Sequence, residues 1–185
     1  MTEGGKGGVA LLVGAGDAIG AAVARRFATG GYSVCVARRD AEKSQSVVQE
    51  IITSGGIAHA VSTDVRSEEA VQALFAQVEA ELGPIEVCLF NAGANVKSSL
   101  IETSTKLFSR VWELACYGGF LTSREAARYM VPRGRGTILF TGATASIRGG
   151  SGFAAFAAAK FGLRGGTVRG TRARSKEYPC SRPDH

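Results

Sequence analysis

The sequence lacks the segments and residue clusters that mark membrane proteins, metal proteins and disulfide-linked proteins. No apolar run in its 185 residues approaches the roughly 18 residues that a membrane span needs, and no apolar leader precedes the first strand-like run. The four cysteines include no Cys-x-x-Cys pair, and His59 and His185 belong to no metal-ligand or triad pattern. We therefore expect free thiols in the cytoplasm, no metal and no membrane contact.

Basic charge is in excess, but half of the excess lies at one end of the chain. Residues 166–185 carry five basic and two acidic side chains, so their net charge of +3 is half of the total of +6. A basic tail without a recognisable nucleic-acid-binding motif is usually solvated. Nucleic acid is therefore not an expected partner.

Apolar strand-like runs alternate with helical patterns up to Leu163. The runs predict strands at residues 9–13, 33–37, 57–62, 85–90 and 137–141. The helical patterns cover residues 19–29, 40–53, 67–82, 104–130 and 153–163. Because short loops join them, these elements predict an α/β protein with a doubly wound parallel sheet, the Rossmann fold. We expect one domain over residues 1–164 and a disordered basic tail over residues 165–185.

The segment between the first predicted strand and helix is rich in glycine. It reads Gly14-Ala15-Gly16-Asp17-Ala18-Ile19-Gly20. Small residues let the backbone approach a pyrophosphate, and the following helix offers it free N–H groups and a positive dipole end. Any tight turn can use glycine, but the position inside a β-α-β unit favours a phosphate site. We therefore predict a dinucleotide site on Gly14, Gly16, Asp17, Ala18, Ile19 and Gly20, where a branched side chain at Gly20 would obstruct the pyrophosphate.

Two arginines follow the second predicted strand. Arg38 and Arg39 lie 18 and 19 residues after Gly20. An acidic residue at the end of this strand would bond the ribose hydroxyls of NAD, whereas a basic residue pairs with the 2′-phosphate of NADP. Asp40 comes only after the arginines, where it could equally cap the next helix. Two solvated surface arginines are the alternative interpretation, but the charges favour NADP(H) over NAD(H) as the cofactor.

Together these motifs resemble the short-chain dehydrogenase/reductase family. The turn matches the family's Gly-x3-Gly-x-Gly motif, with Ala18 at the middle glycine. Asp64, in Thr63-Asp64-Val65, matches an acidic residue that receives the adenine amino group, so the resemblance places Asp64 and Val65 at the cofactor. Asn91-Ala92-Gly93 matches the family's Asn-Ala-Gly motif, which shapes the nicotinamide side. The resemblance implies hydride transfer between NAD(P) and a carbonyl or carbinol carbon.

The resemblance breaks at the catalytic residues. The family's Tyr-x3-Lys pair reads Phe156-Ala157-Ala158-Ala159-Lys160, so that Lys160 alone is retained as a catalytic and cofactor-binding residue. Phenylalanine has no ionisable proton and cannot act as an acid or base. Ala143 stands at the family's Ser position and Ala115 at its Asn position. The cofactor side is therefore nearly complete, while the catalytic site is degraded.

Three functions stay open on this evidence. The first is an oxidoreductase with an unusual proton donor, for which Thr144, Ser146, Ser151 and Tyr117 are candidates. The second is a catalytically inactive, cofactor-binding pseudoenzyme that acts through partner contact, and the third is a truncated isoform with little independent function. The family's sheet continues with two more strands, so the resemblance implies a sheet that is incomplete at its C-terminal edge. It also implies a homo-oligomer, because the helices matching residues 104–130 and 153–163 commonly form the family's dimer interface.

Overall fold

A parallel five-stranded sheet forms the centre of the computed structural model, which describes residues 7–167. Its strands are β1 (Val9–Val13), β2 (Ser33–Arg38), β3 (Ala58–Ser62), β4 (Ile85–Phe90) and β5 (Thr137–Phe140). Their order across the sheet is β3-β2-β1-β4-β5, and every neighbouring pair is parallel. This arrangement confirms the predicted doubly wound α/β fold.

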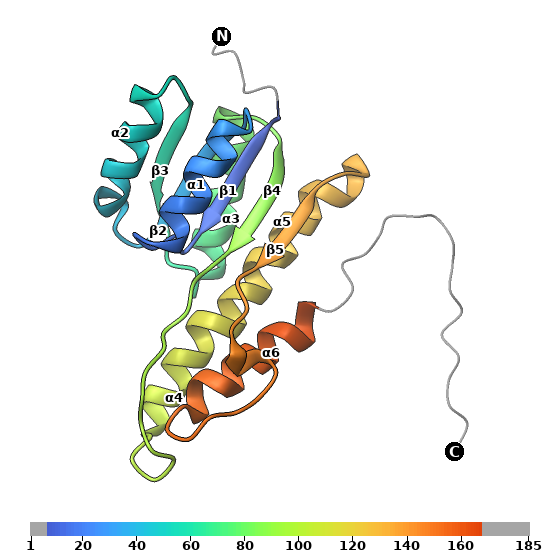
Figure 1. The fold of residues 1–185 in the computed structure, drawn as a ribbon. Coiled ribbons are helices and arrows are strands. Elements are labelled where there is room, and N and C mark those ends of the chain that lie inside the picture. Colours follow the sequence, from blue (N-terminus) through green and yellow to red (C-terminus); the bar gives the residue numbers. More distant parts are fainter. Residues whose placement is uncertain (1–6, 168–185) are drawn as a thin grey trace, which may run out of the picture.

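Helices cover both faces of the sheet (Figure 1). They are α1 (Ile19–Thr29), α2 (Gln45–Thr53), α3 (Glu68–Glu81), α4 (Thr105–Trp112), α5 (Gly118–Arg133) and α6 (Ala154–Thr167), with short helical turns η1 (Ala41–Ser44), η2 (Glu113–Tyr117) and η3 (Thr144–Ser146). The core shared with α1 and α2 lies on one face, and the core shared with α3 and α5 lies on the other. Ser67 caps α3, because its Oγ accepts a hydrogen bond from the Ala70 N–H (3.1 Å).

The alternation of side chains along β1 explains its unbroken apolar sequence. Leu11 and Val13 pack with α3 and α5, whereas Leu12 points to the opposite face and packs with α1 and α2. A central strand that is covered on both faces needs apolar residues at every position. Cys35 and Cys88 lie in these buried strands as free thiols, and burial raises the pKa of both to about 12.

Two predicted helices differ in detail from the structure. The helix expected over residues 104–130 is interrupted by the π-helical turn η2 and then continues to Arg133. The helix runs past its predicted end at residue 130, with Pro132 in its last turn, and stops at Gly134, which has a φ of +66°. The helix expected over residues 40–53 begins as the 3-10 turn η1 before it becomes α2.

The C-terminal part of the described chain differs from the predicted boundary. Helix α6 runs to Thr167, so residues 165–167 are helical and do not belong to a disordered tail. The rest of the predicted tail, residues 168–185, lies outside the described residues. Among residues 7–167, β5 pairs only with β4, and its Leu139 is 41% exposed, so β5 forms an open edge of the sheet. Over the same range, no helix has the length and apolar character needed to cross a membrane.

Candidate cofactor site

The loops after β1 and β4 meet at the carboxyl-terminal edge of the sheet. Strand β1 lies between β2 and β4, so the chain reverses its winding direction at this point and leaves a crevice outside the strand ends. The Gly14 N–H donates to the Ala37 carbonyl oxygen (2.7 Å), and Asn91 Nδ2 donates to the Gly14 carbonyl oxygen (3.1 Å). The structure thus brings the glycine turn and the Asn91 loop together, as the sequence predicts.

The three glycines of the turn have different roles. Gly14 has a φ of +76°, and a Cβ there would lie 2.5 Å from Ala92. A Cβ on Gly20 would lie 2.5 Å from the Ala15 Cα, whereas a Cβ on Gly16 would meet no atom within 4 Å. Gly14 and Gly20 therefore serve chain packing, and Gly16 leaves the backbone open to an approaching ligand. A side chain at Gly20 would strike Ala15 as well as any pyrophosphate beside the turn, so a substitution there also disturbs the packing of the turn.

The amino-terminal end of α1 is free to receive an anion. Its N-cap residue, Ala18, makes no side-chain hydrogen bond to the helix, and the first turn holds no acidic residue. Ala18 and Ile19 are exposed at this end. Backbone N–H groups and the helix dipole therefore remain uncompensated by side chains, which is the arrangement that binds phosphate groups.

Arg38 ends β2 beside this turn, and an acidic partner holds its guanidinium there. Arg38 Nη1 lies 2.8 Å from Asp17 Oδ1, and the Arg38 side chain is largely buried, whereas that of Asp17 is 81% exposed. Arg39, the second predicted arginine, has an exposed side chain. Asp40 does not cap the following turn; its carboxylate lies 3.4 Å from Lys43 Nζ. Arg38 is thus the cation that lies against the glycine turn.

Two further residues near Arg38 escaped the sequence analysis. A small cavity of about 60 Å³ adjoins the glycine turn, and Arg38, Lys43 and Ser44 are among the residues that line it. The Ser44 hydroxyl is buried and has no hydrogen-bond partner among the described residues. The sequence pattern did not indicate that Lys43 and Ser44 lie near Arg38. The turn η1 brings both residues back to the end of β2.

Asp64, predicted at the adenine, already has a partner of its own. Its carboxylate accepts hydrogen bonds from Arg66 Nε (2.9 Å) and Nη2 (2.5 Å) and from the Arg66 backbone N–H (3.1 Å). The Arg66 guanidinium holds the pKa of Asp64 below its usual range, with a smaller contribution from Arg39. Val65 is buried against Gly118, so its side chain packs in the core. Arg66 was missed by the sequence analysis, although its position two residues after Asp64 suits such a local pair.

Lys160 lies between the loops that follow β4 and β5. Its side chain is buried, Nζ donates a hydrogen bond to the Thr141 carbonyl oxygen (2.8 Å), and burial lowers its pKa. A Cβ on Gly93 would stand 3.6 Å from Lys160 Nζ and 3.9 Å from the Ala115 Cβ. The predicted nicotinamide-side residues, which also include Ala92, are therefore close to the retained lysine.

Phe156 and Ala143 line one cavity beside Lys160. This cavity has a volume of about 330 Å³ and opens between the loops after β4 and β5. Lys160 Nζ lies 6.0 Å from the centroid of the Phe156 ring, and Phe156 packs against the cluster that contains Ala115. The structure therefore brings the three catalytic positions together, with an apolar side chain at two of them.

One of the four alternative hydroxyls, that of Thr144, belongs to a residue that lines this cavity. Ser146 is buried and its Oγ accepts a hydrogen bond from the Ala143 N–H (3.1 Å). Tyr117 is stacked between the rings of Trp112 and Phe120. Ser151 is exposed and is not among the residues that line the cavity. Thr144 is thus the alternative donor that the geometry favours.

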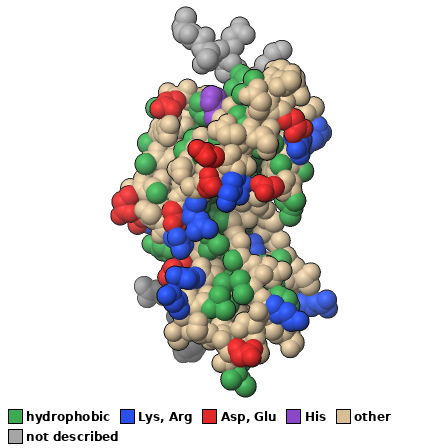
Figure 2. Space-filling model, turned by 90° about the vertical axis from the view of Figure 1, so that its left-hand side faces the viewer, with side chains coloured by type: hydrophobic (Ala, Val, Ile, Leu, Met, Phe, Trp, Pro, Cys, Tyr) green, Lys and Arg blue, Asp and Glu red, His purple; other side chains and the backbone are tan. Residues whose placement is uncertain are grey.

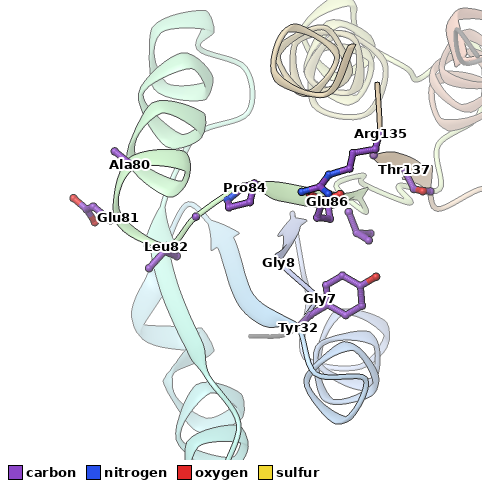
Figure 3. A pocket seen from close by; sticks show the side chains of 13 residues that line it. Gly7, Gly8, Tyr32, Ala80, Glu81, Leu82, Pro84, Glu86, Arg135 and Thr137 are labelled. Atoms are coloured by element: carbon purple, nitrogen blue, oxygen red, sulfur yellow. The ribbon is translucent and has the colours of Figure 1, made fainter. Parts of the chain in front are cut away.

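A hollow of about 700 Å³ lies at the opposite edge of the sheet, where the strands begin (Figure 3). Gly8 and Pro84 line it just ahead of β1 and β4. Its two neighbouring charged side chains, Arg135 and Glu86, face each other with an Nη2–Oε1 distance of 3.0 Å. None of the predicted site residues lines this hollow. We therefore place the candidate site at the carboxyl-terminal edge.

The described residues include no cluster of metal ligands, and the face in Figure 2 carries charges of both signs. Residues 7–167 contain no group of three or more His, Cys, Asp or Glu side chains placed to hold a metal ion, and His59 is exposed. On the face shown in Figure 2, basic and acidic side chains are intermingled over the upper and middle parts of the molecule. This face therefore lacks the continuous positive field of nucleic-acid-binding surfaces.

The doubly wound sheet, the glycine turn and the uncapped end of α1 define a dinucleotide-binding α/β protein. The sequence profile of the short chain dehydrogenase family matches residues 8–176, and the chain belongs to this family. A solved short-chain dehydrogenase from Rhodopseudomonas palustris is 49% identical, with a TM-score of 0.83 over 87% of this chain and 76% of that one. A metagenomic short-chain oxidoreductase solved in complex with NADP is 31% identical, with a TM-score of 0.82 over 86% of this chain and 72% of that one.

The chain is shorter than some relatives that it matches. A short-chain dehydrogenase/reductase from Armillaria gallica is 32% identical over 163 residues, which are 86% of this chain but 62% of that protein. The range that the family profile matches, residues 8–176, includes the glycine turn and the loops described above. Family membership therefore supports NAD(P) binding and an oxidoreductase ancestry for the described residues.

Proposed function

We propose that this protein binds NADP(H) in preference to NAD(H) and does not carry out the carbonyl reduction that is typical of its family. The observation that carries the first part is the position of Arg38, held by Asp17 against the exposed glycine turn (2.8 Å). A guanidinium at the end of β2 pairs with a 2′-phosphate, which NAD lacks. The metagenomic relative was solved in complex with NADP, so a chain of this family at 31% identity accepts that cofactor.

Replacing Arg38 by Ala is expected to remove most of the preference for NADPH over NADH. A charge-assisted contact is worth about 1.5–3 kcal/mol, so NADPH should bind about ten to a hundred times more weakly while NADH affinity stays unchanged. Arg39→Ala should have a smaller effect, because the Arg39 side chain is exposed. Titration of nicotinamide fluorescence measures both affinities.

Arg26→Ala, at an exposed position in the last turn of α1, is the matched control. Equal NADPH and NADH affinities in the unmodified protein would refute the preference.

The second part of the proposal concerns catalysis. Phe156 and Ala143 line the cavity where the family's proton donor and oxyanion-binding hydroxyl are expected, and neither side chain can transfer a proton. Of the family's catalytic residues at these positions, Lys160 alone is retained, and it would hold the cofactor ribose and supply a positive charge. A pseudoenzyme that holds the cofactor without turnover fits these side chains best. Turnover through an unusual donor is the second candidate, and the observation that favours it is Thr144 in the wall of the same cavity.

The third part of the proposal is self-association through the outer face of α4, η2 and α5. Trp112 and Phe120 are exposed there, and their rings stack on either side of Tyr117 with centroid distances of 6.3 Å. Exposed, pre-ordered aromatic rings are typical of interfaces. A second copy is the proposed partner because the family's dimer helices correspond to this face.

The double change Trp112→Glu with Phe120→Glu is therefore expected to convert a dimer into monomers. Light scattering after size-exclusion chromatography gives the molar mass of each variant. Ile52→Glu, which places the same charge at an exposed position on α2, should leave the dimer intact. A monomeric unmodified protein, or a dimer in all three variants, would contradict this interface.

The free thiols support a cytoplasmic location as a further part of the proposal. Cys35 and Cys88 are free and buried, and they are held in strands too far inside the fold to form disulfides with an outside partner. Proteins with unpaired buried cysteines are typical of reducing compartments. A cytoplasmic location is therefore part of the proposal, and localisation of the tagged protein tests it.

A further inference from the structure

The cavity beside Phe156 is built by two loops that hold each other in place. Asn95 comes from the loop after β4, and the remaining lining residues come from the segment between β5 and the first turns of α6. The Ser98 N–H donates to the Gly152 carbonyl oxygen (2.8 Å), and Ser98 and Phe153 form an isolated parallel bridge. The cavity is thus a formed feature of this edge of the sheet, where α/β proteins bind their ligands.

One charged side chain lines the cavity, and it has no counter-charge. Arg148 is the only charged residue among those lining it, and within residues 7–167 its guanidinium forms no hydrogen bond or ion pair. Its backbone N–H donates to the Thr144 carbonyl oxygen (3.1 Å), which fixes the start of the side chain at the cavity wall. An uncompensated guanidinium beside an apolar hollow attracts an anion, and its planar fork matches a carboxylate.

The rest of the lining is suited to an apolar ligand body. Phe153 and Phe156 present their rings from the start of α6, and Ala143 and Ala145 contribute methyl groups from the loop after β5. Asn95 adds a side-chain amide that has no hydrogen-bond partner among the described residues. The volume of about 330 Å³ suits a small molecule.

We propose that this cavity binds small carboxylates with an aromatic or aliphatic body, whose carboxylate pairs with Arg148 while the body packs on Phe153 and Phe156. The inference rests on the proposed function because the carboxylate would lie beside the bound cofactor. The charge of the ligand, and not its apolar body alone, then decides selection.

The test compares three probes in calorimetric titrations, with the protein free and saturated with NADP⁺. Phenylacetate carries both recognised features, phenylacetamide has the same body without charge, and acetate has the charge without the body. We expect phenylacetate to bind at least tenfold more tightly than either of the others. Arg148→Gln should abolish this preference and leave phenylacetamide binding unchanged, whereas Arg26→Gln should change nothing. Circular dichroism confirms that each variant is folded.

Each outcome separates this inference from the proposed function. If NADPH binds but phenylacetate and phenylacetamide bind alike, or neither binds, the carboxylate site is refuted and the cofactor site stands. An unchanged phenylacetate affinity in Arg148→Gln also refutes it. If the carboxylate preference appears in a protein that binds neither NADPH nor NADH, the cavity is confirmed and the proposed function fails.

Discussion

Changing Phe156 to Tyr together with Ala143 to Ser is expected to create ketone-dependent NADPH oxidation in a protein that otherwise has none. A positioned general acid contributes about 10²–10⁴-fold to a rate, and a hydroxyl at residue 143 would add stabilisation of the developing oxyanion. Both positions line the same cavity, and Lys160 Nζ already lies 6.0 Å from the centre of the Phe156 ring. We therefore expect at least about a hundredfold increase over the background rate of the unmodified chain.

The same experiment includes its own controls. Adding Lys160→Met to the double variant should abolish the gained activity, because the new tyrosine would lose the neighbouring ammonium that lowers its pKa. Thr144→Ala in the unmodified protein should change nothing. Steady ketone-dependent NADPH consumption by the unmodified protein, lost in Thr144→Ala, would show instead that Thr144 serves as the proton donor.

Gly16→Val is expected to lose cofactor binding, whereas Gly20→Val is expected to lose stability. A side chain at Gly16 meets no protein atom within 4 Å, so the fold should survive while the side chain blocks the pyrophosphate. At Gly20 the added Cβ would lie 2.5 Å from the Ala15 Cα, which cannot move aside without shifting the turn. Gly20→Val should therefore lower the free energy of unfolding by about 3 kcal/mol or more through overpacking.

Chemical denaturation and NADPH titration together separate these two effects. Gly16→Val should unfold at the same denaturant concentration as the unmodified protein and bind NADPH at least about a hundredfold more weakly, a loss of about 2.7 kcal/mol. Gly16→Ala is the matched, smaller change and should give an intermediate affinity. A Gly16→Val variant with unimpaired binding would show that the turn does not hold the pyrophosphate.

The sheet could be predicted because the residues that determine its strands and turns are close together in the sequence. The unbroken apolar run of β1 follows from burial on both faces, and the acidic first turn after Ser67 marks the start of α3. The glycine turn is equally local, since Gly14 needs a positive φ between a strand and a helix. The same pattern reasoning ended helix α5 at residue 130, whereas the helix accommodates Pro132 in its last turn and stops at Gly134.

Apart from the local pair of Asp64 and Arg66, the missed features depend on contacts between segments that are distant in sequence or on unusual helical turns. The π-helical turn η2 has no periodic signature, yet it sets the position of Ala115 near Gly93 and Lys160. Arg148 looked like any surface arginine, because its cavity arises only when the loops after β4 and β5 come together. The sequence likewise gave equal weight to four hydroxyls, and tertiary packing selects Thr144 among them.

Titration of the purified chain with NADPH and with NADH, followed by the intensity and anisotropy of nicotinamide fluorescence, tests the central claim most directly. A cofactor site at the glycine turn with Arg38 at the 2′-phosphate predicts saturable binding of both, at least tenfold tighter for NADPH, with binding lost in Gly16→Val. The absence of any binding by a folded protein, or equal affinities that Gly16→Val leaves unchanged, would contradict it.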